Sequence, residues 1–191
     1  MSLAQQEAAA TAGRMSFSHL GIYVTDLPMM EEFYTRMLGF IVTDRGEARG
    51  NPIVFLSGDP REHHQLVLVG GRPKDSFSQI NQISFRVPAL EDVQAAWRRA
   101  KDAPGVGRIY ATNHGNAWSV YFFDPEGNRV EVFADSEWYI PQPRIDDLDL
   151  SKPAADIRAE SEQFCRSCAG YMPLAEYQQK IADRIAAARS K

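Results

Sequence analysis

The chain has 191 residues, of which 44% are hydrophobic and 24% charged, with 21 basic and 25 acidic side chains. The formal charge of −4 argues against nucleic acid as the main partner, because phosphate binding needs a surplus of lysine and arginine on one face. No apolar run approaches the roughly 18 residues that cross a bilayer, and the N-terminal stretch lacks the pattern of a signal peptide. We therefore expect a cytoplasmic protein with no nucleic-acid or membrane partner.

The first predicted element is a strand over residues 17–24. Because side chains alternate across a strand, Leu20, Ile22 and Val24 share an apolar face and His19 lies on the other. A helix is predicted next, with Asp26 as its N-terminal cap and Gly39 as its left-handed stop. Short strands are then expected at 40–43, 53–56 and 64–69.

The same order of elements repeats with an offset of 63 residues, which aligns Val24 with Val87 and His19 with Gln82. The second unit is predicted to contain a strand at 80–87, a helix at 90–100, and strands at 108–111, 118–123 and 129–133. The repeat predicts an α+β fold built from paired βαβββ modules, at about 15–70 and 78–135.

Composition divides the chain into three predicted parts: a flexible tail at 1–14, a domain at 15–135, and a mostly helical C-terminal extension at 136–191. One helix of the extension is predicted over about 151–169. A second has the apolar stripe Leu174, Tyr177, Ile181 and Ile185. The extension cannot bury this stripe alone, so it must pack on the core or on a second subunit, and we expect a homodimer.

Polar and aromatic side chains share the strand faces opposite the apolar ones, and they include His19, Gln82, Tyr121 and Glu131. Because buried ionisable groups are costly without a purpose, this mixed lining predicts a cleft. In the repeat, His64 corresponds to Glu131, with Leu66 as the alternative match. Four potential donors can therefore converge near the pseudo-twofold axis.

Imidazole, amide and carboxylate groups form a hard-to-borderline ligand set, suited to Fe(II), Mn(II), Zn(II) or Ni(II). Three protein ligands on one side of a metal would leave positions open for substrate and oxygen. A structural zinc site would instead need four closed ligands rich in cysteine, and Cys165-x-x-Cys168 lacks a second pair.

Two stretches of sequence bring a family resemblance. His-Leu-Gly-Ile-Tyr-Val at 19–24 is followed by Phe-Tyr-x3-Leu-Gly-Phe at 33–40, and Val-Tyr-Phe-x-Asp-Pro-Glu-Gly-Asn-Arg-Val-Glu stands at 120–131. They resemble the vicinal oxygen chelate superfamily, which includes glyoxalase I, extradiol ring-cleaving dioxygenases, fosfomycin-resistance enzymes and bleomycin-resistance proteins. The likeness covers about 15–135 and implies paired modules with a metal held in the sheet cup.

Within the superfamily, the chain looks most similar to small extradiol dioxygenases of the catechol and dihydroxybiphenyl type. This resemblance implies metal ligands at His19 and Glu131, and catalytic roles for His64, Tyr121 and His114. It also implies Fe(II) as the cofactor, with a catecholic aromatic and O2 as the substrates.

The sequence departs from that pattern at Gln82, which stands where those dioxygenases place their second metal histidine. Either Gln82 ligates through its oxygen, or His64 becomes the ligand, or metal affinity and ring cleavage are lost. The alternative functions are a glyoxalase-like metal-dependent lyase or isomerase, and a metal-free small-molecule binding protein of the resistance type. His63 is expected to face away from His64 and to have a structural role only.

Overall fold

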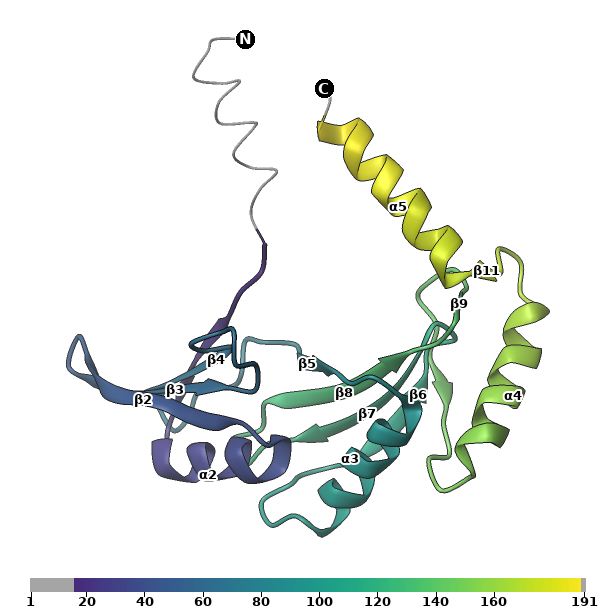
Figure 1. Cartoon of the computed structure of the whole chain (residues 1–191). Coiled ribbons are helices and arrows are strands. Elements are labelled where there is room, and N and C mark those ends of the chain that lie inside the picture. Colours follow the sequence, from purple (N-terminus) through teal and green to yellow (C-terminus); the bar gives the residue numbers. More distant parts are fainter. Residues whose placement is uncertain (1–15, 190–191) are drawn as a thin grey trace, which may run out of the picture.

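The computed structural model describes residues 16–189, in which two βαβββ modules lie next to each other (Figure 1). The tail expected at 1–14 lies outside the described residues. The first module consists of β1 (Leu20–Val24), α2 (Leu27–Leu38), β2 (Ile41–Ala48), β3 (Asn51–Ser57) and β4 (Leu66–Gly70). Its sheet has the strand order β1-β4-β3-β2, with β1 and β4 parallel and the other pairs antiparallel.

The second module repeats this arrangement. It consists of β5 (Ile83–Arg86), α3 (Leu90–Asp102), β6 (Tyr110–Asn113), β7 (Ala117–Phe123) and β8 (Arg129–Asp135). Its five-stranded sheet has the order β10-β6-β7-β8-β5, in which β10 (Asp146–Asp147) adds an outer strand. Helices α2 and α3 cover the same side of the two sheets (Figure 1). The α+β fold of paired βαβββ modules is thereby confirmed.

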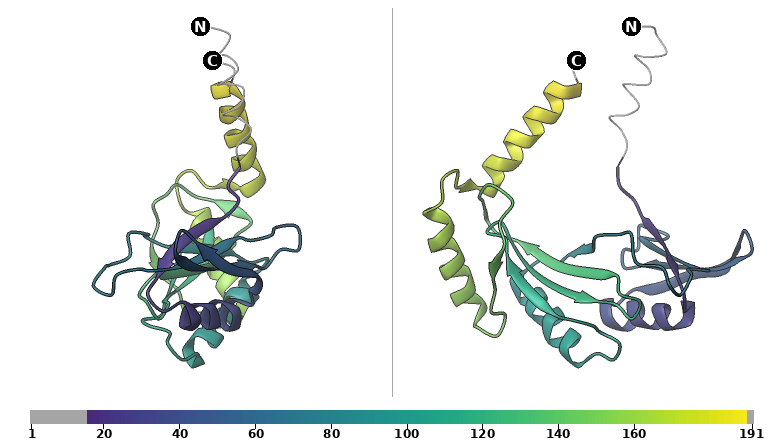
Figure 2. Two further views of the ribbon diagram at one scale, coloured as in Figure 1. Left: turned by 90° about the vertical axis from the view of Figure 1, so that its left-hand side faces the viewer. Right: turned by 180° about the vertical axis from the view of Figure 1, so that it is seen from behind.

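The C-terminal segment contains two helices with different environments. It consists of β9 (Trp138–Tyr139), α4 (Ala154–Arg166), β11 (Met172–Pro173) and α5 (Leu174–Arg189). Helix α4 packs Ile157 and Cys165 into the core, whereas α5 buries no residue and extends away from the sheets (Figure 2). Tyr177 of α5 stacks on Tyr139, with ring centroids 3.6 Å apart. None of the helices within 16–189 has the length and apolar content needed to span a membrane.

Strand alternation follows the predicted faces. Ile22 and Val24 are buried under the helices, whereas Tyr23 between them is 64% exposed on the opposite face. In α2, the Asp26 side chain accepts a hydrogen bond from the backbone N–H of Met29, and Gly39 ends the helix with φ of 75°. The cap and the stop predicted for this helix are therefore both present.

Three residues expected on strands lie just before them. His19 precedes β1, His64 lies two residues before β4, and Gln82 precedes β5. For His19 and Gln82 the reason is that β1 and β5 are edge strands, each paired with one parallel neighbour. Their ladders begin at Leu20 with Leu66 and at Ile83 with Val130.

The ladders also correct the predicted counterpart of Glu131. Glu131 lies opposite Ser84, and the repeat aligns Ser84 with Gly21, whose partner is Val67. Val67 therefore occupies the place of Glu131 in the first module. The expected match to His64 was wrong, as was the alternative match to Leu66, because the loops before β4 and β8 differ in length.

Polar contacts join the two modules beside the end of β1. The Glu126 carboxylate accepts hydrogen bonds from the backbone N–H groups of Thr25 and Asp26, both at 2.7 Å. Deeper in the junction, the Tyr34 hydroxyl donates to Oδ2 of the buried Asp124 at 3.0 Å. Burial, and then the charge of Asp124, raise the pKa of Tyr34, so its hydroxyl stays protonated and donates.

We expect Tyr34→Phe to lower the free energy of unfolding by about 1–3 kcal/mol, because it removes one donor from a buried carboxylate. Urea unfolding followed by circular dichroism measures this change. The matched control is Tyr23→Phe, which alters an exposed side chain and should shift stability by less than about 0.5 kcal/mol. Equal effects of the two substitutions would contradict a stabilising role for the Tyr34 contact.

Candidate active site

The carboxylate of Glu131 is the most heavily hydrogen-bonded group in the predicted cleft. Glu131 is 6% exposed on β8, between β5 and β7. Its Oε1 accepts hydrogen bonds from Ser119 at 2.8 Å and Tyr121 at 2.5 Å. Its Oε2 accepts from Gln82 at 2.8 Å and Ser84 at 2.5 Å. All four donors are neutral, so the carboxylate is solvated but its charge is not neutralised by them.

Tyr121 connects Glu131 to His114. Burial, followed by the hydrogen bond to Glu131, raises the pKa of Tyr121 well above its usual range, so its hydroxyl stays protonated. The tyrosine oxygen lies 2.9 Å from Nε2 of His114, and the other ring nitrogen lies 2.6 Å from the carbonyl oxygen of Arg144. Two of the predicted catalytic residues therefore lie together beside the predicted carboxylate ligand.

Gln82 forms a bridge between a cation and an anion. Its Nε2 donates to Glu131, and its Oε1 accepts from Nη2 of Arg129 at 3.2 Å. The reverse amide orientation would place the NH2 group against the guanidinium and the oxygen against the carboxylate, so these contacts fix the orientation. The oxygen of Gln82, which is the atom that could ligate a metal, faces Arg129 in this arrangement.

The predicted histidines of the first module form a second cluster. The rings of His19 and His64 meet edge to face, with centroids 4.3 Å apart. Nδ1 of His64 lies 2.8 Å from Nδ1 of His63, whose Nε2 lies 2.8 Å from Oδ2 of Asp44. His63 therefore contacts His64, contrary to the expectation that it faces away. Burial, and then the neighbouring His19 and His63, lower the pKa of His64.

A cleft of about 1160 Å³ lies between the modules, and of the predicted site residues only Gln82 lines it. Ser84 lines it beside Gln82, and Ser18 and Leu20 line it on either side of His19, but His19 itself does not. Within residues 16–189, no three histidine, cysteine, aspartate or glutamate side chains form a group that could hold a metal. Of the expected ligands His19, Gln82 and Glu131, only the histidine and the glutamate belong to these four residue types. Gln82 and Glu131 are in contact through a hydrogen bond.

By donor type, this set fits a divalent cation. A carboxylate, an amide oxygen and an imidazole are hard-to-borderline ligands. The Glu131 carboxylate is buried and accepts hydrogen bonds only from neutral groups, with Nε2 of His114 4.0 Å away. A buried anion in these surroundings favours a cation beside it.

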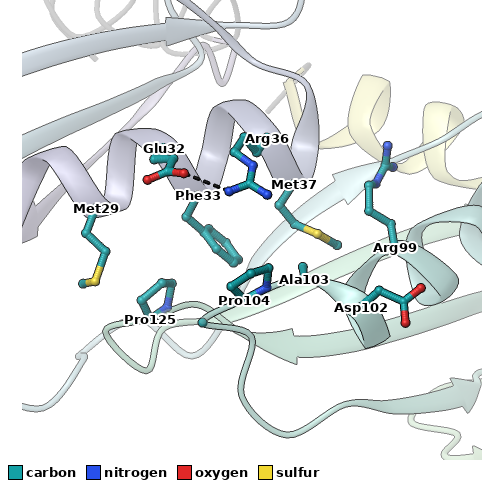
Figure 3. A pocket seen from close by; sticks show the side chains of 11 residues that line it. Met29, Glu32, Phe33, Arg36, Met37, Arg99, Asp102, Ala103, Pro104 and Pro125 are labelled. Carbon is teal, nitrogen blue, oxygen red and sulfur yellow. Dashed lines mark hydrogen bonds and ion pairs between the residues drawn. The ribbon is translucent and has the colours of Figure 1, made fainter.

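A separate apolar pocket of about 590 Å³ lies between α2 and α3 (Figure 3). Met29, Phe33 and Met37 line it, and Glu32 and Arg36 form an ion pair of 2.8 Å at its side. It contains none of the predicted site residues and is lined by the two helices, by residues 103–105 after α3 and by Pro125 between β7 and β8.

Comparison with known proteins places the chain in a family. The family model of the Glyoxalase/Bleomycin resistance protein/Dioxygenase superfamily matches residues 16–132. The chain therefore belongs to this superfamily, which includes dioxygenases.

Two relatives carry names that refer to an activity. Biphenyl-2,3-diol 1,2-dioxygenase 3 of Rhodococcus globerulus is 29% identical over 125 residues, which cover 62% of this chain and 63% of that protein. Metapyrocatechase of Pseudomonas sp. (strain CF600) is 26% identical over 125 residues, covering 64% of this chain and 40% of the relative. The chain thus spans less than two thirds of the length of both relatives.

Solved structures show the same fold. A glyoxylase/bleomycin resistance protein/dioxygenase domain from Frankia sp. EAN1pec has a TM-score of 0.56 at 21% identity, covering 64% of this chain and 98% of that domain. The fosfomycin resistance protein FosX from Listeria monocytogenes, in its hexagonal form, has a TM-score of 0.51 at 18% identity, covering 64% and 94%.

Several residues at the site were not predicted as site residues. By strand alternation Ser84 and Ser119 share the faces of Gln82 and Tyr121, yet their bonds to Glu131 depend on the strand register. Arg129 lies two residues before Glu131 on the same strand face, and this spacing could have indicated that Arg129 belongs to the site. Asp44 reaches His63 from another strand, and no sequence signal indicates that contact.

We expect His64 to titrate below its ordinary pKa of 6.5 in metal-free protein, because burial disfavours the charged ring. The ring is then neutral at pH 7 and gains a proton only at lower pH. NMR titration of the histidine ring protons measures the midpoint, and His19→Ala should raise it by removing a neighbouring charge. A midpoint at or above 6.5 would contradict the arrangement of the histidine cluster.

Proposed function

We propose that the protein is a metal-dependent extradiol-type dioxygenase that cleaves a catecholic aromatic ring with O2. The observation that carries this proposal is the buried Glu131 carboxylate, hydrogen-bonded to Tyr121 and through it to His114. This arrangement combines an anionic ligand with two hydrogen-bonding groups beside it. Membership of the superfamily and the names of the two relatives support the same reading.

In this proposal, His19, Gln82 and Glu131 would hold the divalent cation. Fe(II) is the first choice, with Mn(II), Zn(II) or Ni(II) as alternatives. His64 is the alternative to Gln82, because it touches His19 while the oxygen of Gln82 faces Arg129. When bound, the metal would supply Lewis acidity and the redox chemistry of O2.

The side chains around the cation would handle protons and orient the substrate. His64, with its lowered pKa, is neutral near pH 7 and can accept a proton from a substrate hydroxyl. Tyr121, with its raised pKa, keeps its proton, which it donates to Glu131 in this structure and which would turn to developing negative charge once Glu131 binds the cation. His114 supports the tyrosine oxygen and is the further candidate for contact with substrate.

The proposed partners are a small catecholic aromatic and O2, with no role for nucleic acid or a membrane. The cytoplasmic location and the homodimer stay predictions from the sequence. We also propose that the chain is divided into a tail at 1–14, a domain at 15–135 and a C-terminal extension at 136–191.

A metal-free binding protein of the resistance type is the second candidate. It is favoured by one observation: the oxygen of Gln82 is hydrogen-bonded to Arg129 and is not directed at Glu131. A glyoxalase-like lyase or isomerase has no comparable observation in its favour. Metal content distinguishes the binding protein from the enzyme.

The direct test is oxygen uptake by Fe(II)-reconstituted protein across a panel of catechols, together with its metal content. We expect stoichiometric metal and a yellow ring-fission product. Glu131→Gln should lower metal affinity by about 100-fold or more and abolish turnover, since it removes the anionic ligand. Asp135→Asn, an exposed change on the same strand, is the control and should leave both unchanged. Metal-free wild type without oxygen uptake would refute the proposal.

Gln82→His provides a separate test of the ligand set. Because imidazole is a stronger donor than an amide, we expect about tenfold tighter binding of Zn(II). Competition with a chromophoric chelator measures this affinity, and Gln82→Ala serves as the control that removes the bridge to Arg129 without adding a ligand. If Gln82→His and Gln82→Ala bind Zn(II) equally, residue 82 lies outside the metal site.

A further inference from the structure

Two arginines border the candidate active site without an acidic partner. Arg129 is half-buried on β8, and Arg108 is exposed just before β6. Neither forms an ion pair with a carboxylate in the described part of the chain, whereas Arg86 on the same sheet pairs with Asp135 at 3.3 Å. A half-buried guanidinium without a counter-charge favours an anion from outside the protein.

Both guanidinium groups lie over tyrosine rings. Tyr110 and Tyr121 are cross-strand neighbours whose rings stack with centroids 4.9 Å apart and an interplanar angle of 12°. The Arg108 guanidinium lies 5.2 Å from the centroid of Tyr110, and that of Arg129 lies 5.6 Å from the centroid of Tyr121. Aromatic and cationic groups are thus combined on one surface.

This surface is joined directly to the Glu131 carboxylate. Tyr121 donates a hydrogen bond to Glu131, and Arg129 reaches it through the amide of Gln82. A substrate ring positioned beside Glu131 and Tyr121 therefore has Arg129 next to it and Arg108 on the adjoining ring of Tyr110. A substrate with an acidic substituent would be attracted by these charges more strongly than a neutral one.

The two arginines differ in what they can still bind. Arg129 donates to Asn81, Gln82 and Tyr110, which uses four of its five N–H groups and fixes its position. Arg108 makes no side-chain hydrogen bond within 16–189, so its planar fork is open to a bidentate carboxylate. Arg129 would thus supply fixed charge, and Arg108 the paired hydrogen bonds.

We propose that the substrate of this protein is an aromatic acid: a catecholic ring that carries a carboxylate, recognised by Arg108 and Arg129. That the substrate is a catechol rests on the proposed function; that it carries a carboxylate is the new inference. It separates this chain from the Rhodococcus relative, because the biphenyl-2,3-diol of that protein's name carries no carboxylate.

The test compares 3,4-dihydroxybenzoate with catechol, which differ only in the carboxylate. Isothermal titration calorimetry of the purified full chain measures both dissociation constants. We expect the acid to bind about tenfold more tightly at low ionic strength, since charge-assisted hydrogen bonds are stronger than neutral ones. The advantage should shrink as salt is added, because the charges are partly exposed. Equal affinities at low salt would overturn the proposal.

Variants assign the effect to the two arginines. Arg108→Gln and Arg129→Gln should each move the ratio of the two dissociation constants towards 1, and Arg108→Lys should restore part of it. Arg158→Gln is the matched control, because Arg158 on α4 also lies over an aromatic ring but already has an acidic partner, Glu91 at 2.6 Å, and it should keep the wild-type ratio. A ratio unchanged by both Arg108→Gln and Arg129→Gln would also overturn the proposal.

Oxygen uptake with the same two compounds separates this inference from the proposed function. Turnover of catechol and its acid at equal kcat/KM, with equal binding, supports the dioxygenase and refutes the acidic substrate. Tighter binding of the acid without any oxygen uptake supports the arginine site and refutes ring cleavage.

Discussion

The arrangement of the second module depends on one buried carboxylate. Glu131 lies inside a sheet, where an unsolvated charge would cost several kcal/mol. Two donors from the β5 side and two from β7 solvate it, so the register of both neighbouring strands must place these groups on one face. A shift of one residue in either ladder would turn its donors to the opposite face. The ladder geometry and the chemistry of the site are therefore determined together.

The need to solvate the Glu131 carboxylate also explains why a glutamine is suited to position 82. An amide can donate to Glu131 and accept from Arg129 at once, so Gln82 satisfies both groups. The glutamine thus supports the carboxylate even without a metal. Its oxygen faces Arg129 while its NH2 group faces Glu131, so the amide has to rotate before that oxygen and the Glu131 carboxylate can bind one cation.

Much of the fold followed from the sequence, because the signals were local. Alternation at Leu20, Ile22 and Val24 gave the buried face of β1, and the cap and stop of α2 were present at Asp26 and Gly39. Strand starts were less predictable, because edge strands end where their single partner ends. The counterpart of Glu131 was misplaced for a related reason: the pairing of β1 with β4 depends on loop lengths that differ between the modules.

For the candidate site, the sequence indicated the residue types but not the contacts. His64, Tyr121, His114 and Glu131 were identified from the repeat and the family resemblance, and three of them lie together. The contact between His63 and Asp44 joins strands far apart in sequence, and only the folded sheet brings them together. The imidazoles of His19 and His64 form a cluster in the first module, while the carboxylate belongs to the second.

The proposed function requires that Glu131 and His19 bind the same metal ion. Anomalous X-ray diffraction from crystals soaked in Mn(II) or Fe(II) tests it most directly, because the signal locates the ion without reference to activity. We predict one strong anomalous peak within coordination distance of the Glu131 carboxylate and a nitrogen of His19. A peak elsewhere, or none while Glu131 keeps its four hydrogen bonds, would contradict the account.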